Sequence, residues 1–482
     1  MGDIRSSLFI VGNLLIFIAF YMLIPTLVDL IHNGTDWVAF ISISSFCFFI
    51  GFNISFVFKN KKKSLSINSA FFLTFLCWII LTLVASLPFY LGSINLNFID
   101  SFFESMSGIT TTGATVIENL DETSKSILIW RAMLQWLGGI GIIVIAIAVF
   151  PILKVGGMQL FKTEFSSKDE KVLPRTVTIA SGIGVVYIVL TFCCFLFLML
   201  SGMESFDSFA HSMTIIATGG FSTKNMSIGH FNSVYIEFVT IFFMLISALP
   251  FLLLFQFSKG KFLELLKNSQ VRFFFMIVFV LTLITTFWLM KYYEVNFLQA
   301  LRISSFSIIS ITTGSGFSTY DFSAWGSFTT LILLFFMLIG GCSGSSSCGL
   351  KIFRLQILIN NTFSLIKKII QPRGVFIPTY NSKPIGNDIL TSVTGFFFLY
   401  IFIFSLLTLI LAYDGLDILT ALSGSAAALA NVGPGLSEFI GPSSNYSGLS
   451  DFSKIFLSFA MLIGRLELFP VLILLSPIFW RN

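Results

Sequence analysis

The sequence has few charged residues, very few histidines and few cysteines. Aspartate, glutamate, lysine and arginine make up 11% of its 482 residues, whereas soluble domains carry about 25%. The three histidines lie far apart, so no catalytic metal site is predicted. The six cysteines lie in or beside apolar segments without C-x-x-C spacing, which favours a packing role over a disulfide framework. The net charge of +5 does not imply binding to nucleic acid.

Apolar residues dominate the chain. They make up 56% of it, with 60 phenylalanines, and soluble domains of this composition would expose large apolar areas. Apolar stretches of about 20 residues, enough to cross a bilayer, recur along the chain, and the alternating pattern of a membrane barrel is absent. The sequence therefore predicts an all-α membrane protein. With no soluble domain and no catalytic constellation, it is not expected to be an enzyme or to bind an organic cofactor.

Ten membrane spans are predicted. They cover residues 8–31, 37–58, 67–91, 127–153, 178–202, 232–257, 273–291, 325–358, 387–412 and 453–480. Basic residues follow the second, fourth and sixth spans, at 59–63, 154–175 and 259–272. Because such loops stay in the cytoplasm, we expect a multi-pass protein with cytoplasmic N- and C-termini. The first span has no cleavage site after a short apolar core, so we expect it to be retained.

An internal repeat follows the third, fifth, seventh and ninth spans. Each is followed by an apolar segment too short to cross the bilayer, and then by a stretch with a glycine, namely Gly113, Gly220, Gly316 or Gly433. The next span of each copy carries a similar string, LQWLGG, FMLISA, FMLIGG or AMLIGR. The unit of helix, half-membrane helix, glycine stretch and helix thus occurs four times. The half-helices of the third and fourth copies are expected to be about one turn longer.

The repeats divide the chain into five predicted parts. An N-terminal two-helix domain at 1–65 is followed by pore repeats at 66–155, 156–258, 259–360 and 361–482. Acidic residues lie at or near the starts of the short helices and are expected to act as N-caps. They are Asp100, Glu104, Asp207 and Asp417.

The glycine stretches suggest a pore. Non-helical backbone at membrane depth is tolerated only where it is buried in protein or lines water. Four copies around one axis would present rings of carbonyl oxygens that replace the hydration shell of a cation. Any single stretch is more often an ordinary turn, but four copies in equivalent places favour a pore for a large monovalent cation. The predicted filter residues are Thr111, Thr112, Gly113, Thr218, Gly219, Gly220, Gly314, Ser315, Gly316, Asn431, Val432 and Gly433.

Residues 340–349, GGCSGSSSCG, place small residues in the middle of the eighth span. Since each glycine costs a helix roughly 1 kcal/mol relative to alanine, we predict an intramembrane loop that acts as a gate. Close helix packing through small residues is the alternative. The predicted gating residues are Gly340, Gly341, Ser343, Gly344, Ser345, Ser346, Ser347, Gly349 and Arg465.

Arg465 lies near the middle of the last span. An isolated charge there costs at least about 2.5 kcal/mol, so we expect this arginine to face a partner or the water-filled pathway. A pair with Glu467 is the alternative, and it is disfavoured because residues two apart on a helix do not face each other.

Five segments together resemble the TrkH/KtrB/HKT superfamily of potassium-translocating subunits, in its TrkH-type form. They are FFESMSGITTTGATV at 102–116, WRAMLQWLGGIGIIV at 130–144, ATGGFST at 217–223, NVGPGL at 431–436 and GRLELFPVL at 464–472. The resemblance covers the whole chain, including the N-terminal helix pair. It implies four helix, pore loop, helix repeats around one pore, and potassium uptake across the bacterial inner membrane. It also implies a homodimer whose protomers each hold a pore, and a cytosolic TrkA-like nucleotide-binding subunit that gates it.

The third repeat departs from the family pattern. It reads T-T-G-S-G-F where the family more often has T-T-T-G-F, and alignment on Phe317 makes Gly316 the filter glycine. The alternative function is a secondary cation symporter with alternating access, moving K⁺ or Na⁺ together with H⁺ or Na⁺. Four similar pore units favour a channel-like protein, because alternating-access folds typically have two repeats.

Overall fold

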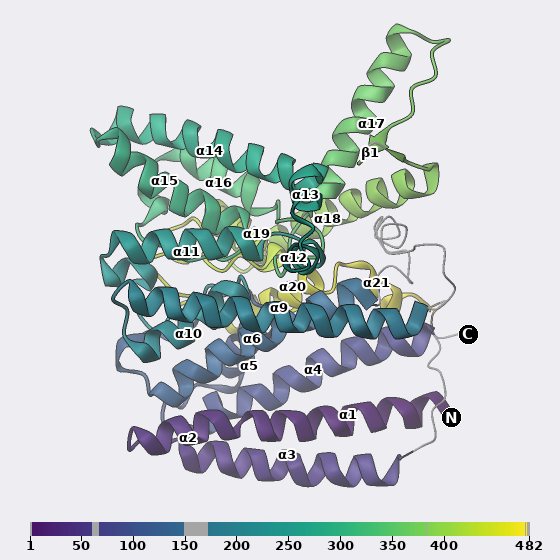
Figure 1. The fold of residues 1–482 in the computed structure, drawn as a ribbon. Helices are drawn as coiled ribbons and strands as arrows, with labels where there is room; N and C mark the ends of the chain where they lie inside the picture. Colours follow the sequence, from purple (N-terminus) through teal and green to yellow (C-terminus); the bar gives the residue numbers. More distant parts are fainter. Residues whose placement is uncertain (1, 60–66, 149–171, 382, 478, 480–482) are drawn as a thin grey trace.

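The computed structural model describes residues 2–59, 67–148, 172–381, 383–477 and 479. Within these residues the fold is helical apart from a two-residue antiparallel pair, β1 (Thr379–Tyr380) and β2 (Lys383–Pro384). Long helices run side by side, α1 begins at the end of the molecule where α21 lies, and α17 projects beyond the bundle (Figure 1). The basic residues predicted at 61–63 and most of the basic loop at 154–175 lie outside the described residues.

The N-terminal helices form one edge of the molecule (Figure 1). They are α1 (Gly2–Tyr21), α2 (Leu23–Ile31) and α3 (Trp37–Val57). Glycines allow α1 and α3 to cross closely, since a Cβ built on Gly12 would lie 2.9 Å from Gly51 O and one on Gly51 would lie 2.7 Å from Gly12 O. Small residues at a membrane helix crossing commonly serve this purpose.

Four short helices each follow a helix of 25 or more residues. The first two groups are α4 (Ile67–Leu91), α5 (Phe98–Ile109) and α6 (Lys125–Ala148), then α9 (Val172–Leu200), α10 (Ser205–Ile216), α11 (Val234–Ser247) and α12 (Phe251–Ser258). After α13 (Phe262–Lys267) come α14 (Ser269–Tyr293), α15 (Phe297–Thr312), α16 (Ser327–Met337) and α17 (Ile352–Ile370). The last group is α18 (Asn387–Tyr413), α19 (Ile418–Ala430), α20 (Asp451–Arg465) and α21 (Phe469–Leu475). Three 3₁₀ turns connect elements at η1 (Leu120–Glu122), η3 (Ser227–Phe231) and η4 (Phe322–Ala324).

The ten predicted spans are not all single helices: seven match described helices, and the other three are bent or broken. Seven described helices are long and apolar enough to cross a membrane, and the α11–α12 pair, bent by 100°, would make an eighth. Pro250 explains that bend, since proline lacks the N–H and disfavours a helical residue before it. The eighth predicted span leaves the helix between α16 and α17, as expected, and the tenth also breaks, just after Arg465.

The expected lengths and N-caps of the short helices were only partly right. At 16 residues α15 is one turn longer than α5, whereas α19 has only 13. Asp417 caps α19 as predicted, with its carboxylate accepting from Thr420 N. Asn97 caps α5 instead of Asp100, while Asp207 lies within the first turn of α10. Glu104 lies inside α5 and is fully buried, so its role is a different one.

Candidate ion pathway

The four predicted filter glycines form a closed ring. Each packs against the carbonyl oxygen of the residue just before the glycine of the next repeat, and the fourth packs against the first. A Cβ built on each glycine would lie close to that oxygen: 2.2 Å from Gly219 O for Gly113, 2.1 Å from Ser315 O for Gly220, 2.0 Å from Val432 O for Gly316 and 2.8 Å from Thr112 O for Gly433. Real Cβ atoms do not approach so closely, so the ring requires glycine.

The backbone that leads into each glycine is the C-cap of a short helix. In every repeat one N–H binds the carbonyl three residues earlier and the next N–H binds the carbonyl five residues earlier. These bonds are Thr111 N to Gly108 O (3.0 Å) and Thr112 N to Ser107 O (2.9 Å), Thr218 N to Ile215 O (3.0 Å) and Gly219 N to Thr214 O (2.9 Å), Gly314 N to Ile311 O (3.0 Å) and Ser315 N to Ser310 O (2.9 Å), and Asn431 N to Ala428 O (3.3 Å) and Val432 N to Ala427 O (2.9 Å). This pairing is the Schellman motif.

The first residue of each cap has a left-handed conformation. Its φ is 55° at Thr111, 52° at Thr218, 73° at Gly314 and 54° at Asn431. Glycine and asparagine suit this position, whereas a β-branched threonine there is strained by about 1–3 kcal/mol. Two residues later, Gly316 has a φ of 74°, close to the 80° of Gly220. The third repeat therefore has the same backbone pattern as the others, and its extra glycine occupies a place that glycine fits best.

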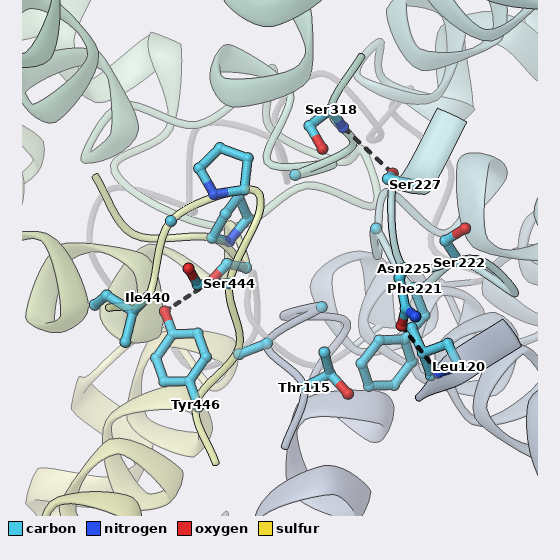
Figure 2. Close-up of a pocket in the computed structure, with 18 of the residues that line it drawn as sticks. Thr115, Leu120, Phe221, Ser222, Asn225, Ser227, Ser318, Ile440, Ser444 and Tyr446 are labelled. Carbon is cyan, nitrogen blue, oxygen red and sulfur yellow. Dashed lines mark hydrogen bonds between the residues drawn. The ribbon is translucent and has the colours of Figure 1, made fainter. Parts of the chain in front are cut away.

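A cavity of about 70 Å³ lies against this ring and is lined by all four glycines. Figure 2 shows side chains from all four repeats around it, among them Thr115, Phe221, Ser318 and Tyr446. The Tyr446 hydroxyl donates to the Gly433 carbonyl (2.8 Å). The residues that line the cavity include no carboxylate, so the oxygens available to an ion there are those of neutral carbonyls and hydroxyls.

A buried ion pair supports the first two repeats. Arg131 Nε donates to Glu104 Oε1 at 2.7 Å, and both side chains are almost fully buried. The same guanidinium donates to Ser222 O (2.9 Å) and to Thr115 Oγ1 (3.1 Å). Glu104 also accepts from Val116 N (2.9 Å). The pair therefore fixes the segments that follow Gly113 and Gly220.

Gln135 and Asn431 also hold ring backbone in place. Gln135 Nε2 donates to Gly219 O (2.6 Å), and its Oε1 accepts from Phe221 N (3.1 Å). Asn431 Nδ2 donates to Thr112 Oγ1 (2.8 Å) and to Met461 O (3.0 Å), which joins the fourth repeat to the first. Sequence reasoning missed Arg131 and Gln135, although the argument applied to Arg465, a charge within an apolar span, also selects Arg131.

Residues 338–351 form a loop between α16 and α17. Its ends pair through Gly340 N to Leu350 O (3.1 Å) and Leu350 N to Leu338 O (2.9 Å). Its middle bonds to the break between α11 and α12, with Cys342 N donating to Ala248 O (3.0 Å) and Phe251 N donating to Gly344 O (2.9 Å). The two breaks in neighbouring repeats thus satisfy each other's exposed backbone groups.

Ser346, at the tip of this loop, lies beside the turn that enters the ring in the second repeat. Ser346 Oγ donates to Ile216 O and to Ser247 O, both at 3.1 Å. Thr218 Oγ1 lies 3.3 Å from Ser346 Oγ. The loop is therefore anchored beside one of the four turns that enter the ring.

Arg465 joins the loop to Gly138 of α6. Its Nη1 group donates to Ser346 O (3.0 Å) and Cys348 Sγ (2.8 Å), and its Nη2 group donates to Gly138 O (2.8 Å). The void between the loop and Arg465 is about 10 Å³, which is room for about one water molecule. The loop and Arg465 therefore leave little space between them.

Glu467 pairs with Arg354 of α17 and not with Arg465. The Arg354 guanidinium lies 3.7 Å from the centre of the Phe396 ring. Glu467 and Leu468 have φ values of 58° and 62°, and Phe469 N bonds to Glu467 O (2.7 Å) across a tight turn. Such a γ-turn with positive φ is rare and strained. The sequence argument also missed Arg354, which lay within a predicted span.

Three comparisons place this geometry among known proteins. A family model described as "Cation transport protein" matches residues 38–481. The potassium uptake protein TrkI of Halomonas elongata is 38% identical over 96% of this chain and 94% of its own. The Trk system potassium uptake protein TrkH of Vibrio parahaemolyticus is 38% identical over 99% of each chain, and that of Escherichia coli K12 is 37% identical, also over 99% of each.

A solved structure matches the whole fold. The crystal structure of the potassium transporter TrkH from Vibrio parahaemolyticus superposes with a TM-score of 0.92, at 36% identity, over 99% of this chain and 100% of the other.

Proposed function

This chain belongs to the TrkH family of cation transport proteins, and on that premise we propose that it takes up potassium ions through the ring formed by its four filter glycines. It is a multi-pass membrane transport protein and not an enzyme. K⁺ is its cargo, and the filter residues are those set out from the sequence, from Thr111–Gly113 to Asn431–Gly433.

The observation that carries this proposal is the closed set of glycine contacts. Four segments that lie far apart in the chain have one backbone conformation and touch one another in chain order. Backbone carbonyls without a carboxylate ring can replace the hydration shell of a large monovalent ion, whereas small divalent ions favour carboxylate ligands. The ends of the four short helices add negative partial charge near the same axis.

The loop at 338–351 and Arg465 are proposed to form the gate. A fixed guanidinium at 3.0 Å from Ser346 O and 2.8 Å from Gly138 O spans the path, and its positive charge repels a cation there. Opening requires these bonds to break or the loop to move aside. The remaining gating residues are Gly340, Gly341, Ser343, Gly344, Ser345, Ser347 and Gly349.

We further propose a TrkA-like nucleotide-binding subunit as the cytosolic partner, with two copies of this chain as a homodimer in the bacterial inner membrane, surrounded by lipid. The family relationship supports both partners. The projecting helix α17 carries exposed Lys367 and Lys368 near its end and begins next to the loop (Figure 1). A partner that binds α17 would therefore act directly on the chain segment that leads out of the gate.

Potassium uptake in cells tests the function. The chain is expressed, together with a TrkA-like subunit, in a bacterial strain that lacks its own potassium uptake systems and grows only at high external potassium. Growth at low potassium and uptake of rubidium as a tracer are expected. Failure of both, with the protein present in the membrane, would overturn the proposal. An uptake rate that depends on the proton or sodium gradient at fixed membrane potential would favour the symporter.

A further inference from the structure

A second cavity, of about 340 Å³, lies between α1, α4, α5 and α6. Its mouth is bordered by Ile10 and Phe17 of α1, whose side chains are 38% and 48% exposed. Both residues belong to the membrane span Arg5–Ile31. The cavity is therefore open towards the hydrocarbon of the bilayer and not towards water.

The inner end of the cavity lies next to the ion pathway. Ile109, the last residue of α5, lines it together with Gly138 of α6. A Cβ built on Gly138 would lie 1.9 Å from Ile109 O, so α5 and α6 touch at this point. Gly138 O is also the acceptor for Arg465 Nη2. Gly138 thus contacts α5 and Arg465, and it also lines the cavity.

The cavity walls suit a long apolar ligand. Its lining is made of aliphatic and aromatic side chains, with the Thr74 hydroxyl and the Cys77 thiol among its few polar groups. A buried water needs two to four polar partners, so water does not suit this space. The volume lies within the usual range for ligand sites, about 300–1,000 Å³.

Gly141 gives a second, independent indication. The neighbouring Gly138 and Gly139 are needed for close packing, because a Cβ on Gly139 would lie 2.5 Å from the Tyr187 hydroxyl and 3.0 Å from Ala217. Gly141 has no such neighbour within 4 Å, and it lines the cavity. Glycine inside a helix costs roughly 1 kcal/mol relative to alanine. The open space at Gly141 is thus a feature of the cavity and not a packing requirement.

We propose that this cavity binds one acyl chain of a membrane phospholipid, which enters between Ile10 and Phe17 and ends against Gly138. In a bilayer, the molecules beside the mouth are lipids, and their acyl chains are long, narrow and apolar. Filling the cavity also restores the dispersion contacts that an empty space would forfeit. The bound chain packs against α6 at Gly138, the residue whose carbonyl accepts from Arg465.

Photo-crosslinking with lipid tests this site. The full chain is reconstituted in vesicles of phosphatidylethanolamine and phosphatidylglycerol with a trace of phosphatidylglycerol carrying a diazirine in one acyl chain. After irradiation, cross-linked peptides are identified by mass spectrometry. The chain around Cys77 and Trp78 and the chain around Gly141 are expected to carry the label.

Two variants fill the cavity and one serves as a control. Gly141→Phe and, separately, Cys77→Leu are expected to reduce labelling of these segments by about tenfold, the change produced by a loss of 1.4 kcal/mol in binding. Gly395→Phe is the matched control, because Gly395 of α18 also has no neighbour within 4 Å and does not line the cavity. Its labelling is expected to equal that of the wild type. Folding of each variant is checked by gel filtration.

Three results would overturn the proposal. The first is wild-type labelling spread evenly over the lipid-facing helices. The second is unchanged labelling in folded Gly141→Phe and Cys77→Leu proteins. The third is cross-links from a bifunctional reagent on Cys77 to a second copy or to residues 149–171, since either would show that protein covers the mouth.

Discussion

The glycine ring and the loop at 338–351 are both irregular, glycine-rich backbone within the membrane, but different contacts hold them. In the ring, every glycine lies against a backbone carbonyl of the next repeat, and each turn has the same pair of cap bonds. In the loop, hydroxyl and guanidinium groups make the contacts with its tip, and a Cβ on Gly344 would meet only Pro250, at 3.9 Å. In the ring, glycine thus allows close approach between repeats, whereas the closest approach at a loop glycine lies within the loop itself, where a Cβ on Gly340 would lie 1.5 Å from Cys348 O.

This difference implies two kinds of behaviour. The ring can change only if four repeats move together, because each glycine contacts its neighbour. At Ser346 the loop is held by bonds of side-chain groups, its own hydroxyl and the Arg465 guanidinium, so this part can move when they break. We therefore expect substitutions at the ring to abolish selective transport, and substitutions at the loop to change how much ion passes.

The largest expected effect is on stability, at the support of the ring. Arg131→Met leaves the Glu104 carboxylate buried without its partner, and the expected loss is about 3–5 kcal/mol of unfolding free energy. Thermal unfolding in detergent measures it. The double variant Arg131→Met/Glu104→Gln is the matched control and should recover most of the loss. An Arg131→Met protein as stable as the wild type would show that the pair does not hold the ring.

The ring itself gives the next largest effect. Gly220→Ser places a Cβ 2.1 Å from Ser315 O, and rubidium uptake is expected to fall by about 100-fold, equivalent to roughly 2.7 kcal/mol. Gly433→Ser should be milder, because the corresponding distance is 2.8 Å. Gly395→Ser, with no neighbour within 4 Å, is the control and should transport normally. Wild-type uptake by Gly220→Ser would remove the distinction between ring and loop.

Arg465→Ala is expected to act in the opposite direction. Loss of the guanidinium removes both the positive charge and the bonds between the loop and Gly138, so rubidium flux into vesicles should rise by about tenfold, or 1.4 kcal/mol. The amount of folded protein should change little. Arg272→Ala, at an exposed arginine, should behave as the wild type. If Arg465→Ala instead fails to fold, this arginine is structural.

The smallest effect is expected at the loop tip. Ser346→Ala removes the hydroxyl that donates to Ile216 O and Ser247 O, and a hydrogen bond of this type contributes about 1 kcal/mol. Flux in vesicles should rise by a few-fold, less than in Arg465→Ala. The double variant should not exceed Arg465→Ala by the full product of the two effects, because both residues act on one loop. A fall in flux would contradict a closing role for the tip.

The sequence predicted the residues of the ring better than the path of the chain around it. The four glycines were found because each follows a short apolar segment at an equivalent place in the repeat. The break after Arg465 was missed, because Glu467 and Leu468 carry no glycine or proline to mark a left-handed turn. The bend between α11 and α12, in contrast, is marked in the sequence by a proline, Pro250. The N-caps were assigned to acidic residues, whereas Asn97 caps α5 and Glu104 pairs with an arginine from another helix. Partners distant in sequence cannot be found from local pattern alone.

The reversal potential of currents through the purified chain in a planar bilayer tests the central claim most directly. With potassium at different concentrations on the two sides and protons and sodium balanced, we expect discrete currents that reverse near the potassium equilibrium potential. Added proton or sodium gradients should leave the reversal unchanged, and Gly220→Ser should move it towards zero. A reversal that follows the proton or sodium gradient, or one that Gly220→Ser does not alter, would contradict a potassium pathway through the glycine ring.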